Sequence, residues 1–124
     1  MRKLFKTLAA AGAALALAQP AQAATIVCGG DSSLTQIGQT SGGFVNVVMS
    51  FGSFYICDVS AAANGVSAET CQTWLAELLA ARGMNKPVTF YFDTAHAANA
   101  NMTSCASTNF GGATRVPFHI QIVF

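Results

Sequence analysis

The sequence predicts a mainly β domain with one helix, and three observations support this fold class. Short runs in which apolar and polar residues alternate recur along the chain, which is typical of half-buried strands. The dipeptide Gly52-Ser53 separates two of these runs and indicates a hairpin. Residues 67–83 repeat apolar side chains with the period of an α-helix. The order β-β-β-α-β-β then matches a five-stranded Greek-key barrel of the OB type, with the helix plugging one end; a plain α+β sandwich is the alternative.

The hairpin is the clearest β feature. A weak alternation over residues 33–37 predicts the strand before it, and residues 44–51 and 54–59 form its two arms. If Phe51 faces Phe54, alternation divides the arms into two faces. The expected core face holds Val45, Val47, Met49, Phe51, Phe54 and Ile56, and the opposite face holds Phe44, Asn46, Val48, Ser50, Tyr55 and Cys57.

The helix is predicted with signals at both of its ends. Ser67 is a suitable N-cap, and Glu69 in the first turn complements the helix dipole. Arg82 lies in the last turn, and Gly83 is a natural stop. The positions expected to face the core recur at steps of three and four residues: Cys71, Trp74, Leu75, Leu78 and Leu79. They predict an amphipathic helix packed against the sheet.

Two more strands are expected after the helix. Pro87 opens a strand over residues 88–93, and residues 94–114 form a long loop rich in small and polar residues. Pro117 precedes the final strand, residues 118–124. Alternation places Phe118, Ile120, Ile122 and Phe124 on one face and His119, Gln121 and Val123 on the other.

The first 23 residues have the pattern of a bacterial secretory signal peptide. A basic head precedes an apolar run at residues 8–17, and Ala21 and Ala23 provide the small residues of a cleavage site. The apolar run is too short for a membrane span. We therefore expect residues 24–124 to form a single domain in the periplasm or outside the cell.

The mature chain, beginning at Ala24, is expected to carry little charge. Three of the six basic residues lie in the predicted signal, so three basic residues face five acidic ones and the formal charge is −2. No basic patch is left for nucleic acid or anionic lipid, so neither partner is expected. No cofactor is expected either, and no membrane span, because no later apolar run is long enough.

All four cysteines lie in the predicted mature chain, and in an oxidising compartment they should form two disulfides. Their scattered spacing does not match a metal site. In an OB-type barrel the first strand runs beside the fourth, which brings Cys28 toward Cys105. Cys57 and Cys71 are joined by a loop that can turn back. We therefore predict Cys28–Cys105 and Cys57–Cys71, with Cys57–Cys105 and Cys28–Cys71 as the alternative.

Three segments together resemble a known group of proteins. They are residues 54–57 (Phe-Tyr-Ile-Cys), residues 71–83 and residues 86–92 (Lys-Pro-Val-Thr-Phe-Tyr-Phe). The chain resembles small secreted bacterial proteins with an OB-like barrel, and it is more distantly similar to the pentameric B subunit of subtilase cytotoxin. That subunit binds sialylated glycans on host cells, so the resemblance implies an oligomer that binds cell-surface glycans. Its sugar-contacting residues have no matched positions in this sequence.

Aromatic side chains are the best candidates for binding. Tyr55 and Tyr91 fall on the outward faces of their strands, and Phe110 lies in the long loop. His119 should point away from the core. Sugars and apolar ligands stack on such rings. Trp74 is expected in the core because it lies on the helix stripe.

A non-catalytic secreted or periplasmic binding module is the leading interpretation, with a glycan or a protein as partner. The glycan-binding oligomer is the second. A small secreted hydrolase is the third, since Asp31 and Asp93 could approach each other if their strands pair. A cysteine nucleophile with His96 or His119 as its base is not expected, because oxidation would remove the thiol. No catalytic residue is therefore predicted.

Overall fold

The computed structural model describes residues 23–108 and 113–124. The described chain forms two three-stranded antiparallel sheets and one α-helix, α1. The signal-peptide prediction falls almost entirely outside the described residues and stays a prediction. In chain order the elements are β1 (Thr25–Cys28), β2 (Gln36–Gln39), β3 (Phe44–Met49), β4 (Gly52–Asp58), α1 (Ala68–Gly83), β5 (Val88–Asp93) and β6 (Pro117–Ile122), with short 3₁₀ turns η1 (Ala97–Asn99) and η2 (Cys105–Thr108) between β5 and β6.

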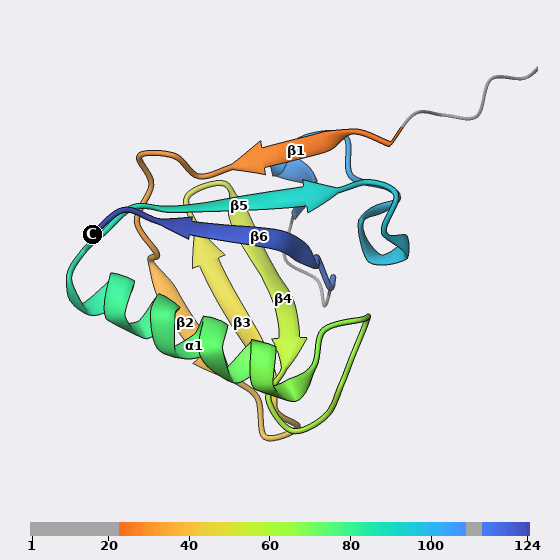
Figure 1. Cartoon of the computed structure of the whole chain (residues 1–124). Coiled ribbons are helices and arrows are strands. Elements are labelled where there is room, and N and C mark those ends of the chain that lie inside the picture. Colours follow the sequence, from red (N-terminus) through yellow and green to blue (C-terminus); the bar gives the residue numbers. More distant parts are fainter. Residues whose placement is uncertain (1–22, 109–112) are drawn as a thin grey trace, which may run out of the picture.

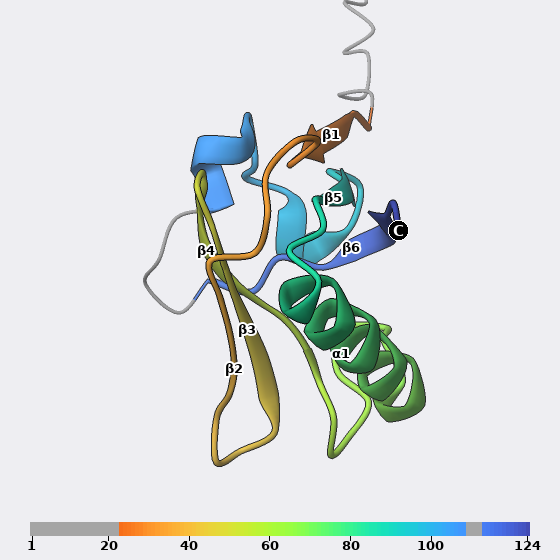
Figure 2. The ribbon, with the colours of Figure 1, turned by 90° about the vertical axis from the view of Figure 1, so that its left-hand side faces the viewer.

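The sheets have the strand orders β1-β5-β6 and β2-β3-β4. Figure 1 shows the strands of the first sheet running across those of the second, with α1 lying along one side of both. In Figure 2, α1 lies to the right of the β2-β3-β4 sheet and below β5 and β6. The apolar faces of the two sheets and of α1 therefore enclose one core.

The mainly β fold class with one helix is confirmed, but the closed five-stranded barrel is wrong. There are six strands, and the two sheets stay open among the described residues. Where one strand was expected before the hairpin, the chain forms β1 and β2 separately. Isolated bridges connect the sheets at Ser33 with Pro87 and at Tyr55 with Thr114.

Gly29 lies where the chain turns away from β5 at the end of β1. Its φ is +118°, and a Cβ at this position would overlap the carbonyl oxygen of Val88 on β5. Only glycine adopts this conformation so close to another backbone. The chain therefore leaves the β5 ladder after Cys28, crosses over, and joins β3 as β2.

The hairpin turns earlier than predicted. Ser50 and Phe51 form its loop, so Gly52 faces Met49 and Phe54 faces Val47. The register differs from the expected pairing of Phe51 with Phe54 by an even number of residues, and an even shift leaves each side chain on its face. The predicted core residues are accordingly buried, apart from the half-buried Phe51: Val45, Val47, Met49, Phe54 and Ile56.

A β-bulge moves Cys57 to the core side. Asn46 faces Tyr55, but Val45 faces Cys57, so Ile56 is the extra residue on β4. The expectation that Cys57 shares a face with Tyr55 is therefore wrong. The bulge turns the Cys57 side chain toward α1, where its partner Cys71 lies.

Both predicted disulfides are confirmed. Cys28 is bonded to Cys105, and Cys57 to Cys71, with Cα–Cα distances of 5.5 and 5.6 Å. The first ties β1 to the 3₁₀ turn η2, and the second ties β4 to the first turns of α1. The two cross-links fit an extracellular or periplasmic protein.

The helix matches its predicted bounds, with a correction to its buried stripe. Ser67 is the N-cap, and its hydroxyl accepts from the Thr70 N–H at 3.1 Å. The fully buried positions are Cys71, Leu78 and Ala81. Leu79 was expected in the core but is 52 % exposed, because it follows the buried Leu78 by one residue and its side chain points about 100° away around the helix axis. No helix in the described part of the chain is long and apolar enough to cross a membrane.

Candidate functional site

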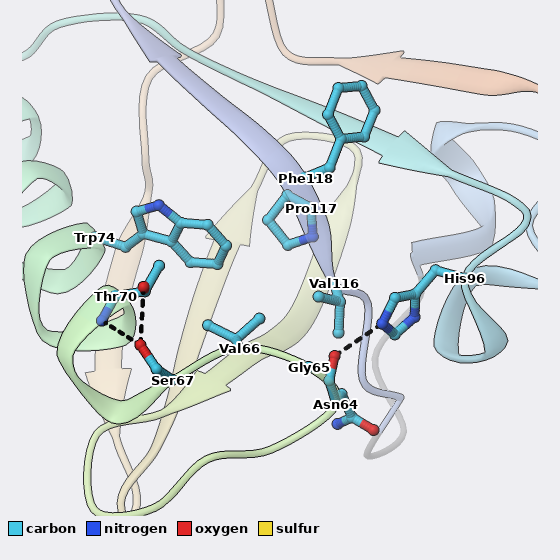
Figure 3. Close-up of a pocket in the computed structure, with 10 residues that line it drawn as sticks. All are labelled: Asn64, Gly65, Val66, Ser67, Thr70, Trp74, His96, Val116, Pro117 and Phe118. Atoms are coloured by element: carbon cyan, nitrogen blue, oxygen red, sulfur yellow. Dashed lines mark hydrogen bonds between the residues drawn. The ribbon is translucent and has the colours of Figure 1, made fainter.

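A hollow in the described surface lies between the start of α1 and the start of β6. Its volume is about 410 Å³, within the usual range of ligand pockets. Figure 3 shows Trp74 at one side, His96 at the other and Val66 between them. We call it the Trp74 hollow; its walls are Asn64, Gly65, Val66, Ser67, Thr70, Trp74, His96, Val116, Pro117 and Phe118.

A tight turn before the helix shapes the lower wall of the hollow. The backbones of Ala63 and Val66 exchange two hydrogen bonds of 3.0 Å. Asn64 and Gly65 between them have φ values of 52° and 80°. An Asn-Gly pair is the usual sequence for such a two-residue turn with positive φ. Val66 is buried directly after it, so the turn fixes the apolar floor.

His96 joins this turn to the loop after β5. One ring nitrogen, Nδ1, accepts from the Ala98 N–H at 3.1 Å, and Nε2 lies 2.8 Å from the Asn64 carbonyl oxygen. A nitrogen that accepts carries no proton, so these two bonds assign a neutral ring that donates from Nε2. His96, which was considered only as the base of a cysteine nucleophile and rejected, instead holds one wall of the hollow.

Trp74 is half-buried rather than enclosed in the core, so the expectation for it is wrong in part. One side of its ring packs against the core cluster, and another lines the hollow. Thr70, one turn earlier on α1, lines the same wall and accepts a hydrogen bond of 2.9 Å from the Ser67 hydroxyl. An aromatic surface with hydroxyl groups beside it is suited to a ligand that has both apolar and hydrogen-bonding parts.

The structure brings two of the predicted binding residues together on the outer face of the β1-β5-β6 sheet. Tyr91 and His119 are paired across β5 and β6, with ring centroids 5.1 Å apart. The Tyr91 hydroxyl donates to Gln121 Oε1 at 2.8 Å. Phe118 completes the group, with its ring 6.2 Å from that of Tyr91. We call these four residues the Tyr91 platform.

The other predicted binding residues do not join the platform. Tyr55 lies on the second sheet, where it packs edge-on against Phe44 with ring centroids 6.2 Å apart. With Thr40 and Thr114 this pair borders a smaller hollow of about 250 Å³. Phe110 lies outside the described residues, and its predicted role stays a prediction.

The described lining of the Trp74 hollow is free of acidic side chains and of Lys and Arg. Asp31 and Asp93 do not approach each other: Asp93 faces Thr25 at one end of the β1–β5 ladder, and Asp31 lies beyond the other end.

The Ser60 hydroxyl and N–H donate to Asp58 Oδ1 and hold the pKa of that carboxyl below its ordinary value. The Asp58 carboxylate therefore stabilises the turn after β4.

Two side chains that the sequence analysis missed fix the long loop. Asn99 is fully buried, donates to the carbonyl oxygens of Asp93 (3.1 Å) and Val116 (2.7 Å), and accepts from the Val116 N–H (2.9 Å). Arg115 is buried as well and donates to the carbonyl oxygen of Ala98 at 2.8 Å. They attach the loop that carries His96 to the segment before β6, so both walls of the hollow depend on them.

Asn99→Ala is expected to destabilise the fold by about 2 kcal/mol, because it leaves buried backbone groups without their hydrogen bonds. Urea denaturation followed by circular dichroism measures the loss. Gln39→Ala, an exposed amide on the edge strand β2, is the control and should stay within about 0.5 kcal/mol of the parent. Equal midpoints for the two variants would contradict the role given to Asn99.

Comparison of the chain with protein-family models, with curated proteins and with solved structures found no match in any of the three. A function therefore has to come from the chemistry of the hollow and the platform. Among the described residues, no group of three or more His, Cys, Asp or Glu side chains is placed to hold a metal ion.

Proposed function

We propose that this chain is a non-catalytic binding module that works outside the cytoplasm and holds its ligand in the Trp74 hollow. One observation carries the proposal: a half-buried tryptophan forms the wall of a hollow of about 410 Å³ that also contains hydroxyl, amide and imidazole groups. Pockets that bind small molecules combine apolar walls with a few polar groups in this way.

The walls of the hollow favour an uncharged ligand. An anionic ligand would need a basic side chain or several free N–H donors to replace its water, and burying an unpaired charge is costly. The basic residues of the described chain lie elsewhere: Arg82 and Lys86 are at the far end of α1, and Arg115 is engaged with the long loop. The same reasoning argues against a free cation, because no carboxylate lines the hollow.

The compartment follows from the cross-links and from the predicted signal peptide. Two disulfides fit an oxidising environment, and a cleavable signal would deliver the chain there. We also propose that the strand order is of the OB type. The pairing of β1 with β5 supports this order, although the two sheets are open among the described residues.

The intrinsic fluorescence of Trp74 tests the proposal directly, because it is the only tryptophan in the chain. We expect methyl β-glucoside, methyl β-galactoside or N-acetylglucosamine to change its emission in a saturable way. Free sialic acid, which is anionic, should have no effect. These probes are small rings with hydroxyl groups and an apolar face, which suits stacking on an aromatic wall.

A matched pair of variants shows whether the response comes from the hollow. Thr70→Phe adds bulk to the wall of the hollow and should abolish the change in emission. Thr73→Phe makes the same substitution one turn further along α1, at an exposed position outside the hollow, and should respond like the parent. The proposal would be overturned if none of the neutral probes changed the Trp74 emission of the parent, or if the emission of the Thr70→Phe variant still changed.

The second candidate function is the oligomeric glycan-binding subunit that the resemblance implies. The aromatic rings of the Tyr91 platform are the feature that supports it, because sugars stack on such rings. It requires a ring of subunits and sialylated ligands, whereas the leading proposal requires neither. Light scattering coupled to gel filtration and a glycan array would separate the two.

A further inference from the structure

Phe118 belongs to both surfaces. It lines the Trp74 hollow, and its ring lies 6.2 Å from the ring of Tyr91 on the platform. Figure 3 shows the Phe118 ring standing above Pro117, on the side away from Val66 and the floor of the hollow. The hollow and the platform are therefore neighbouring parts of one surface, with Phe118 at the boundary.

A β-bulge places Phe118 at this boundary. Tyr91 faces His119 and Phe92 faces Pro117, so Phe118 is the residue without a partner in the ladder. Regular alternation would have turned it toward the core, but it is 59 % exposed. Bulges are frequent beside functional sites, where they redirect one side chain. Here the redirected side chain is a phenylalanine held on the surface between two aromatic groups.

We infer that the ligand is a linear, uncharged oligosaccharide that occupies both surfaces. One ring lies in the hollow against Trp74, the chain crosses Phe118, and a later ring stacks on Tyr91. This inference rests on the proposed function and adds the length and chemistry of the ligand.

The two surfaces repeat the same combination of groups. The hollow sets the Trp74 ring beside the Thr70 hydroxyl, and the platform sets the Tyr91 ring beside the Gln121 amide. Each unit of a neutral saccharide chain likewise has an apolar face and hydroxyl groups at its rim. A chain of such units therefore meets a suitable partner at both surfaces.

One carboxylate on the same face of the sheet disfavours an acidic saccharide chain at the platform. Asp93 follows Tyr91 by two residues on β5, so its side chain is on the same face of the sheet. Its carboxylate accepts only the Ala95 N–H, at 2.8 Å, among the described hydrogen bonds of that side chain. A sialylated or uronic acid chain would place its own carboxylate near this one, and like charges repel.

The test compares N-acetylglucosamine with its β-1,4-linked disaccharide and hexasaccharide, using Trp74 emission to follow binding. The affinity of the parent should rise by at least about ten-fold from the monosaccharide to the hexasaccharide, because the second contact is made within one complex. In Phe118→Ala the ratio of the hexasaccharide affinity to the monosaccharide affinity should fall to near one, whatever the variant does to monosaccharide binding, because Phe118 also lines the hollow. Phe124→Ala, at another exposed phenylalanine near the end of β6, should behave like the parent.

The outcomes separate the inference from the proposed function. A parent that binds the monosaccharide and the hexasaccharide equally keeps the proposed function and overturns the inference. A Phe118→Ala variant with the full gain in affinity also overturns it. If no saccharide changes Trp74 emission, both the inference and the proposed function fail.

Discussion

Phe54→Ala is expected to destabilise the protein by about 4 kcal/mol, which is within the usual range for deleting a fully buried phenylalanine side chain. Phe54 extends from β4 into the space between the sheets and meets two rings of β5 edge-on. Its centroid lies 5.3 Å from that of Phe90 and 5.5 Å from that of Phe92. All three rings are fully buried. The variant would therefore remove a buried aromatic contact between the two sheets.

Urea denaturation under oxidising conditions measures this effect. Phe124→Ala removes the same atoms from a residue that is 63 % exposed, and it should change the free energy of unfolding by no more than about 0.5 kcal/mol. A loss of less than about 1 kcal/mol for Phe54→Ala would mean that the sheets are held together by something other than this aromatic cluster.

Elements with strong local signals could be predicted from the sequence. The helix begins after Ser67 as expected, because N-capping is local, whereas Gly83 is its last residue and Met84 is the C-cap. The core face of the hairpin also follows from alternation, even though Phe54 pairs with Val47 instead of Phe51. A period of two tolerates an even error in register.

Features decided by contacts between distant segments were not predictable in this way. The two bulges reverse the faces of Cys57 and Phe118, and no local pattern marks either of them. The break between β1 and β2 depends on the approach of Gly29 to the backbone of Val88, which lies about sixty residues further along the chain. The predicted first strand over residues 33–37 corresponds only to the start of β2, and β1 was not predicted; the described strands form two open sheets instead of the closed barrel.

The candidate site was predicted only in part. Tyr91 and His119 lie on adjacent strands with matching faces, so alternation and strand order together bring them side by side. Trp74 was assigned to the core because the helix stripe identifies the inward side but not where the core ends. His96 acquires its role only through the Asn64 carbonyl oxygen, which belongs to a turn thirty-two residues away.

Removal of the Cys28–Cys105 disulfide by a double substitution to alanine is expected to cost about 4.5 kcal/mol in the chain-entropy model. The bond closes a loop with a sequence separation of 77, so it limits the unfolded chain far more than a short loop would. It also fastens β1, an edge strand of four residues that pairs only with β5. Without the bond we expect β1 to separate from β5 before the rest of the domain unfolds.

The matched comparison is the double alanine variant of Cys57 and Cys71, whose bond spans a sequence separation of 14. The same model gives about 3 kcal/mol for that loop. Its two cysteines are buried, so loss of packing adds to its cost. Hydrogen exchange distinguishes the variants better than global stability does. Amides of β1 should lose protection in the Cys28 and Cys105 variant and keep it in the other, and uniform loss in both would show that β1 is not held separately by its disulfide.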